Sequence, residues 1–201
     1  LSTAYDKETR WTIPGSAAYQ AENAALAILA MRILQHQYPM EFGLPDTEQK
    51  LHEGMLHAVW PGRMQEIAPE IYFDGAHNTS GISKFIEAAA RLTSEDAYRP
   101  FLLFSMVKEK DYSTSIDMLT ADISWEEMAV TTIPNERGIS FEKLQKLFKE
   151  DTDRPVTGYA DYREALKAMC RKKKPGQKLF CTGSLYFIGA LLEAWKENCD
   201  D

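Results

Sequence analysis

The sequence predicts an α/β fold: a Rossmann-like, mostly parallel open sheet with helices on both faces. Two observations support this prediction. From about residue 60 onward, short apolar segments rich in β-branched and aromatic residues alternate with amphipathic segments of helical length. Such alternation is typical of βαβ units. In addition, polar residues directly follow two of the apolar segments, as expected where parallel strands end at a ligand-binding edge.

The apolar segments are predicted strands, and the amphipathic segments between them are predicted helices. The strands cover residues 71–74, 101–106, 128–133, 156–159 and 179–182, and the helices cover 79–92, 112–121, 140–150, 162–172 and 184–197. Right-handed crossovers follow from this alternation. Residues 63–68 predict one more strand at the sheet edge, where antiparallel pairing is common.

The N-terminal region predicts helices and a linker. Residues 17–34 are rich in Ala, Leu, Ile and Met and contain no Gly or Pro, which predicts a helix over about 17–35. Pro39, Gly43 and Pro45 interrupt this pattern, so residues 35–46 are interpreted as a linker. A shorter helix is predicted over 47–60, with Asp46 or Thr47 as its N-cap.

Composition excludes several classes of protein. The chain has 201 residues, 44% of them hydrophobic, which suits one domain of about 100–150 residues with an extension. No apolar run approaches the ~20 residues of a membrane span, and the net charge of −7 argues against general nucleic-acid binding. The three scattered cysteines suggest no disulfide framework, and there is no secretory signal, so we expect a cytoplasmic protein. The first residue is not Met, and we interpret the chain as a fragment of a longer protein.

The basic run from Arg171 to Lys174 precedes Pro175-Gly176. Its favoured interpretation is a helix C-terminus, where cations complement the helix dipole. A polyanion-binding site is the alternative.

The clearest candidate site combines Trp60-Pro-Gly-Arg63 with Asp74-Gly-Ala-His-Asn78. Asp74 ends a predicted strand, where a carboxylate can bind a ribose diol; its alternative role is to cap the next helix. His77 and Asn78 stand just before a helix N-terminus, whose unpaired N–H groups favour an anion such as a carboxylate. Arg63 can bind phosphate or carboxylate through two parallel hydrogen bonds, or it is a solvated loop residue.

Further candidates follow the other predicted strands. Ser184, in Thr182-Gly-Ser-Leu185, either caps the last helix or contacts a ligand there. Asp111 is interpreted as an N-cap, and Lys110 and Arg137 as scaffold residues at the rim of the site, although their roles stay open. Because the chain has no P-loop, H-E-x-x-H, C-x-x-C or G-x-S-x-G motif, the residues alone predict a site for a phosphate-bearing or anionic ligand and no particular reaction.

Taken in order, these motifs resemble the C-terminal domain of folylpolyglutamate synthase, a family within the Mur ligase superfamily whose bacterial members often double as dihydrofolate synthase. The resemblance runs from Trp60 to the end of the chain. The segments Gly15-Ser-Ala-Ala-Tyr-Gln20 and Glu22-Asn23 resemble the end of the family's central ATPase domain. The resemblance therefore implies two parts: residues 1–45 end the central domain and form a linker, and residues 46–201 form the Mur-ligase-type C-terminal domain.

The resemblance also implies a reaction in folate biosynthesis and one-carbon metabolism. ATP phosphorylates a carboxylate of the folate-type substrate, and the amino group of L-glutamate displaces the phosphate to form an amide. Arg63 and His77 would be the catalytic residues, with Arg63 at the ATP phosphates, Asp74 at the ribose and Asn23 near the adenine. His77, Asn78 and Ser184 would bind glutamate. Mg²⁺ would be held by ligands in the missing upstream domain.

The implied partners are L-glutamate, a folate-type substrate and the chain's own upstream ATPase domain, in a protein that we expect to be a monomer. The isolated chain lacks the P-loop and is expected to be inactive. Two alternatives stay open: a fragment of a Mur-type peptidoglycan ligase, and a non-catalytic ligand-binding module with the same fold. The motifs do not distinguish addition of the first glutamate from extension of a polyglutamate tail.

Overall fold

The computed structural model describes residues 11–15, 17–43 and 47–197, and the chain divides into two compact units, Leu1–Trp60 and Pro61–Asp201. The first unit contains α1 (Tyr19–Gln37), α2 (Pro39–Phe42) and α3 (Thr47–Leu56). The predicted first helix is therefore confirmed, but it continues into the segment interpreted as a linker, which also holds α2. Asp46, one candidate N-cap of α3, lies outside the described residues, and α3 ends before residue 60.

An ion pair joins the helices of the first unit. Arg32 on α1 donates from Nη1 and Nη2 to the two carboxylate oxygens of Glu48 on α3, at 2.5 and 2.7 Å. The Trp11 ring stacks on His52 of α3 with 4.0 Å between ring centroids. The Arg32–Glu48 pair thus joins α3 to α1, and both helices belong to the first compact unit, which ends at Trp60. The domain boundary expected between residues 45 and 46 stays a prediction.

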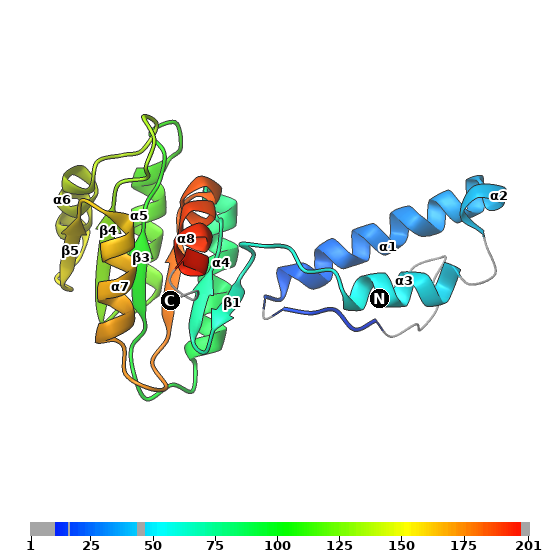
Figure 1. Ribbon diagram of the computed structural model, residues 1–201, viewed down its shortest axis with the longest axis horizontal. Helices are drawn as coiled ribbons and strands as arrows, with labels where there is room; N and C mark the ends of the chain where they lie inside the picture. Colours follow the sequence, from blue (N-terminus) through cyan, green and yellow to red (C-terminus); the bar gives the residue numbers. More distant parts are fainter. Residues whose placement is uncertain (1–10, 16, 44–46, 198–201) are drawn as a thin grey trace. The chain divides into compact units, whose positions relative to one another are not determined.

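The second unit is built on a six-stranded sheet in the order β1-β2-β6-β3-β4-β5 (Figure 1). Its strands are β1 (Gln65–Ala68), β2 (Ile71–Phe73), β3 (Phe101–Phe104), β4 (Glu127–Thr131), β5 (Val156–Tyr159) and β6 (Leu179–Thr182). All neighbouring strands are parallel except β1 and β2, which pair antiparallel. The predicted sheet and its antiparallel edge strand are confirmed.

Helices alternate with these strands and cover both faces of the sheet. They are α4 (Thr79–Thr93), α5 (Tyr112–Asp122), α6 (Phe141–Asp151), α7 (Tyr162–Lys172) and α8 (Leu185–Glu197). Successive strand residues point to opposite faces. Cys181 accordingly belongs to the cluster that includes Phe187 of α8, whereas the ring of Phe180 meets that of Phe85 on α4 at a centroid distance of 5.9 Å.

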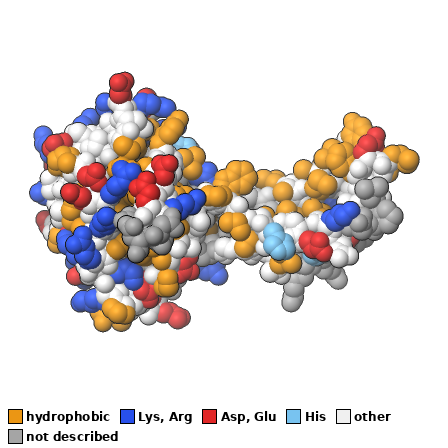
Figure 2. Space-filling model, in the orientation of Figure 1, with side chains coloured by type: hydrophobic (Ala, Val, Ile, Leu, Met, Phe, Trp, Pro, Cys, Tyr) orange, Lys and Arg blue, Asp and Glu red, His pale blue; other side chains and the backbone are white. Residues whose placement is uncertain are grey.

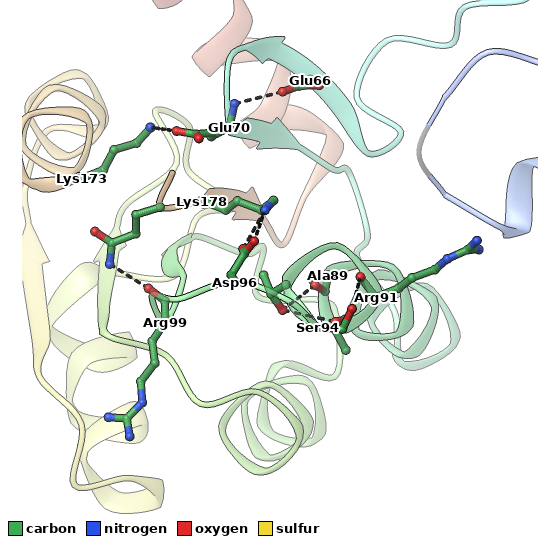
Figure 3. Close-up of polar contacts among 12 residues, drawn as sticks. Glu66, Glu70, Ala89, Arg91, Ser94, Asp96, Arg99, Lys173 and Lys178 are labelled. Atoms are coloured by element: carbon green, nitrogen blue, oxygen red, sulfur yellow. Dashed lines mark hydrogen bonds and ion pairs between the residues drawn. The ribbon is translucent and has the colours of Figure 1, made fainter. Parts of the chain in front are cut away.

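The basic run at the end of α7 is part of the scaffold, as the favoured interpretation predicted. Lys172 pairs with Glu127, and Lys173 with Glu70, each with 2.6 Å between nitrogen and oxygen. Figure 3 shows the Lys173–Glu70 pair near the amino ends of the strands, together with a bidentate pair between Lys178 and Asp96. These pairs join strand starts to neighbouring loops, so the lysines serve the fold rather than a polyanion.

Acidic and basic side chains are interspersed on the visible face of the second unit (Figure 2). Apolar side chains gather along α1 and α2 of the first unit, where Leu26, Tyr38 and Met40 are exposed. Within the described part of the chain, none of the helices combines the length and apolarity needed to cross a membrane.

Candidate active site

The candidate site lies where β2 and β6 end side by side. Asp74 follows β2, and its backbone N–H donates to the carbonyl oxygen of Cys181 in β6 at 2.9 Å. The two motifs that follow these strands are in contact here. The Leu185 side chain at the start of α8 lies so close to Gly75 that a Cβ added to Gly75 would collide with it. The sheet order thus brings the Asp74–Asn78 segment next to the start of α8, which carries Ser184, although the two segments are far apart in the sequence.

The Asp74 carboxylate is buried and held by backbone donors. Its Oδ2 accepts a hydrogen bond from the Met64 N–H, and its Oδ1 accepts one from the Ala76 N–H, both at 2.8 Å. Only 3% of the residue is exposed, so these bonds offset the cost of removing a charge from water. Asp74 therefore joins the turn before β1 to the end of β2.

The N-cap of α4 is Asn78. Its side-chain oxygen accepts a hydrogen bond from the Gly81 N–H at 2.7 Å, and its backbone is extended, as an N-cap requires. The alternative interpretation of Asp74 as the helix cap is therefore wrong. The side chain of Asn78 is exposed, so it stands at the surface of the site.

Arg63 lies beside the Asp74–Asn78 segment. The carbonyl oxygen of Gly62 accepts a hydrogen bond from the Gly75 N–H at 2.7 Å, which ties the Pro-Gly-Arg turn to the end of β2. A Cβ placed on Gly75 would lie 3.4 Å from Nη1 of Arg63. The guanidinium therefore passes next to Gly75, and the structure brings together the cation and the acid that the sequence analysis singled out.

The orientation of His77 is set by the backbone. Its Nδ1 lies 2.9 Å from the carbonyl oxygen of Gly75, and the ring is half-buried. A carbonyl oxygen only accepts hydrogen bonds, so Nδ1 must carry the proton in this contact. In the neutral ring Nε2 is then the acceptor nitrogen.

Ser184 caps α8, the simpler of its two predicted roles. Its Oγ accepts a hydrogen bond from the Tyr186 N–H at 3.2 Å, and its carbonyl oxygen accepts one from the Ile188 N–H at 3.0 Å. The residue is 2% exposed and follows Gly183. The hydroxyl proton is not used in the bond to Tyr186, because the oxygen is the acceptor there.

Sequence reasoning left Arg137 undecided, and the structure places it against the start of α8. Its Nε pairs with Glu109 Oε1 at 2.9 Å, and its Nη1 donates to the Tyr186 hydroxyl at 3.3 Å. The hydrogen bond that Arg137 donates to the Glu109 carboxylate raises the pKa of Arg137 above its usual value. Glu109 and Tyr186 lie 28 and 49 residues from Arg137, so no local pattern could have revealed this cluster.

The remaining candidates serve the scaffold or belong to the first unit. Asp111 caps α5 by accepting a hydrogen bond from the Thr114 N–H at 3.2 Å, as expected, and Lys110 is half-buried in the loop before it. Asn23 is exposed on α1 in the first unit, where its amide donates to Gln20 at 3.2 Å. Among the described residues, no group of three or more His, Cys, Asp or Glu side chains could hold a metal ion.

A cavity of about 290 Å³ lies at the amino ends of the strands, opposite to the end that carries the candidate site. It is lined by the loop before β3 and by the end of α5, including Asp96, Arg99 and Asp122. In open α/β sheets, ligands bind outside the carboxyl ends of the strands. We therefore assign the candidate site to the Arg63–Asp74–His77 cluster rather than to this cavity.

Comparison with known proteins places this arrangement in a family. Residues 62–185 match the model of the Mur ligase, glutamate ligase domain. The chain belongs to this family. The matched residues of the glutamate ligase domain begin in the turn that carries Arg63 and end at Leu185, so they include the candidate site.

The chain is similar to the dihydrofolate synthase/folylpolyglutamate synthase of Bacillus subtilis, with 28% identity over 185 residues, 89% of this chain and 39% of that protein. Folylpolyglutamate synthase of Lacticaseibacillus casei is 29% identical over 187 residues, which again cover 89% of this chain and 39% of that protein. The structure of E. coli FolC in complex with ADP superposes with a TM-score of 0.81 at 19% identity, over 100% of this chain and 44% of FolC, which shows the shared fold. The chain thus spans about two-fifths of the length of these curated relatives.

Proposed function

We propose that this chain is the C-terminal glutamate- and ATP-binding part of an ATP-dependent ligase that adds L-glutamate to folate or dihydropteroate. The observation that carries the proposal is the convergence of Arg63, Asp74 and His77 at the carboxyl ends of β2 and β6 in a Mur ligase glutamate ligase domain. The names of the curated relatives support folate as the substrate class. A Mur-type peptidoglycan ligase and a binding module are the competing proposals.

Arg63 and Asp74 would serve the nucleotide. The Arg63 guanidinium is always charged and would stabilise the phosphoryl group as ATP phosphorylates the folate carboxylate. Asp74 would hold the ribose, and Asn23 would lie near the adenine. Mg²⁺ bound by an upstream ATPase domain would neutralise phosphate charge.

His77, Asn78 and Ser184 would bind the incoming glutamate. The Nε2 of neutral His77 is a hydrogen-bond acceptor suited to the amino group, and the Ser184 hydroxyl proton is a donor suited to a carboxylate. The amino nitrogen attacks the acyl phosphate carbon, and inorganic phosphate leaves as the amide bond forms. In this assignment Ser184 combines helix capping with substrate binding.

The proposed site needs a second domain. Arg63 stabilises a phosphoryl group only when the nucleotide is brought to it, and closure of two domains would exclude water and align the reactants. The exposed apolar side chains of Leu26 and Met40 on α1 and α2 support further protein next to the first unit. We propose that the whole enzyme is a cytoplasmic monomer and that this chain alone is inactive.

The test is ADP release by the full-length natural protein that carries this chain. It is supplied with Mg-ATP, L-glutamate and one of three acceptors: dihydropteroate, a reduced folate or a UDP-muramyl peptide, with the isolated 201-residue chain as the blank. Turnover with a pteridine supports the proposal and distinguishes its two activities. Turnover with the muramyl peptide alone would favour the cell-wall ligase, and no turnover would favour the binding module.

A pair of arginine variants tests the site itself. Arg63→Ala is expected to lower kcat by ~10²–10³-fold, the usual cost of removing one group that stabilises transition-state charge. Arg99→Ala is the matched control, because Arg99 is exposed at the amino edge of the sheet (Figure 3) and should leave kcat unchanged. Equal kcat values for the two variants would contradict the role proposed for Arg63.

A further inference from the structure

The turn that carries Arg63 is held by hydrogen bonds on both sides of this residue. Before Arg63, the Gly62 N–H donates to Gln65 Oε1 at 2.9 Å, and the Gly62 carbonyl oxygen accepts from the Gly75 N–H at 2.7 Å. After Arg63, the Met64 N–H donates to the buried Asp74 carboxylate at 2.8 Å. Arg63 is therefore the middle residue of a clamped turn.

The backbone of this turn is strained. Met64 has a φ of 44°, in the left-handed region that β-carbon-bearing residues seldom adopt, and it is only 2% exposed. Such a conformation persists only where the surrounding structure imposes it, and strained residues cluster at functional sites. Gly62 also has a positive φ, and a Cβ there would lie 2.9 Å from Cγ2 of Ile188. The turn is thus fixed from both α8 and β2.

Two side chains take part in these hydrogen bonds, those of Gln65 and Asp74, and the proposed mechanism gives a role only to Asp74. Gln65 begins β1 and is paired with Phe73, the residue before Asp74, so the sheet register fixes its backbone next to the site. Its half-buried side chain folds back onto the Gly62 N–H. The amide oxygen of Gln65 accepts the hydrogen bond from the Gly62 N–H at the start of the turn, and the Asp74 carboxylate accepts the one from the Met64 N–H at its end.

We propose that Gln65 is a positioning residue: it acts through the Gly62–Met64 turn to hold the Arg63 guanidinium at the transferring phosphoryl group. This inference rests on the function proposed above for Arg63. Small displacements of a charge-stabilising group can cost ~10²-fold in rate. Loss of the Gln65 side chain would let the Arg63 guanidinium shift, so we expect it to lower kcat rather than to weaken substrate binding.

The test compares two variants that each remove a side-chain oxygen from the same hairpin. Gln65→Leu removes the acceptor of the Gly62 N–H, and the control Glu66→Leu removes the acceptor of the Glu70 N–H at the other turn, a 3.0 Å bond (Figure 3). In the full-length protein, Gln65→Leu should lower kcat by ~10-fold or more with KM for ATP and glutamate unchanged. Glu66→Leu should leave kcat as in the wild type, and Gln65→Glu, which keeps an oxygen at this place, should restore most of kcat.

A double-mutant cycle with Arg63→Ala separates positioning from general damage to the fold. If Gln65 acts through Arg63, Gln65→Leu should have no further effect on kcat in the Arg63→Ala background. Additive losses would overturn the inference, as would a wild-type kcat in Gln65→Leu.

A second readout needs no enzymatic activity. In the 201-residue chain, the rate at which phenylglyoxal modifies Arg63, mapped by mass spectrometry, should rise about fivefold in Gln65→Leu, as expected for the loss of one hydrogen bond. The rate at Arg99 serves as internal reference, and Glu66→Leu should leave both rates unchanged. An unchanged rate of phenylglyoxal modification at Arg63 would overturn the inference about Gln65, even if the full-length protein proved inactive. If the full-length protein is inactive but the modification rate at Arg63 rises in Gln65→Leu, the result counts against the proposed function alone.

Discussion

Gly183 shows how a single residue permits two strand ends to meet. Its φ is 119°, a conformation that a side chain strongly disfavours, and an added Cβ would collide with the carbonyl oxygen of Ser105 and the ring of Phe104. Ser105 follows β3, the strand next to β6, so the two backbones approach closely at the carboxyl edge. Glycine at this position allows the chain to pass from β6 into α8, which Ser184 then caps.

Substituting this glycine should be costly, and a second glycine on α8 provides a matched control. Gly183→Ala should lower the free energy of unfolding by at least ~2 kcal/mol, because backbone strain adds to the collision with Ser105. Gly189 is exposed within α8 and has open space around it, so Gly189→Ala should raise stability by up to ~1 kcal/mol. Urea unfolding followed by circular dichroism measures both, and similar changes in the two variants would contradict this account.

At the scale of elements, α5 and α6 pack with two acids facing each other. Asp117 lies on α5, and Asp151 is the last residue of α6. Burial, followed by a hydrogen bond and charge repulsion from Asp117, raises the pKa of Asp151 above its usual value. The folded protein therefore holds this proton more tightly than the unfolded chain does, so this acid destabilises the fold once the pH rises through its folded pKa.

This pair predicts a pH-dependent gain of stability in Asp151→Asn. Near pH 7 the variant should be more stable than the wild type by less than ~1 kcal/mol, because exposed charges are screened and because a negative charge at a helix C-terminus is unfavourable. Below about pH 4, where carboxyls are protonated in the unfolded chain too, the difference should vanish. Thermal unfolding across this pH range tests the prediction, and a gain that persists in acid would contradict it.

At the scale of the whole molecule, the second unit contains both the sheet and the candidate site. Pro61–Asp201 holds all six strands, the helices on both faces and the residues Arg63, Asp74, His77 and Ser184. Large aromatic side chains on one face of the sheet, such as Phe180 and Phe104, contact α4 and α6, and the opposite face is covered by α7 and α8. The core of this unit is thus closed by its own elements.

The second unit should therefore fold by itself. A protein of residues 61–201 is expected to unfold in one cooperative transition, with slow amide hydrogen exchange in the central strands β3, β4 and β6. The wild-type chain is the reference for exchange at the same amides. Loss of protection throughout the sheet in the shorter protein would show that residues 1–60 are needed for its stability.

The sequence by itself determined the elements and the composition of the candidate site. Hydrophobic periodicity is a local property, so it identified the helices of the second unit, its strands and the antiparallel edge strand. Asp111 was recognisable as an N-cap, because capping depends on near neighbours. The meeting of the Asp74 and Ser184 motifs could also be expected, since both follow strands of one parallel sheet.

Only the tertiary structure decided which distant groups touch. In the folded chain β6 lies between β2 and β3, Arg137 donates a hydrogen bond to the Tyr186 hydroxyl, and Glu48 of α3 pairs with Arg32 of α1. The tertiary structure also showed that the Asp74 carboxylate holds the Met64 backbone in a left-handed turn. Strand order, backbone strain and long-range ion pairs depend on contacts between residues that no local pattern relates, so they become visible only when the chain is folded.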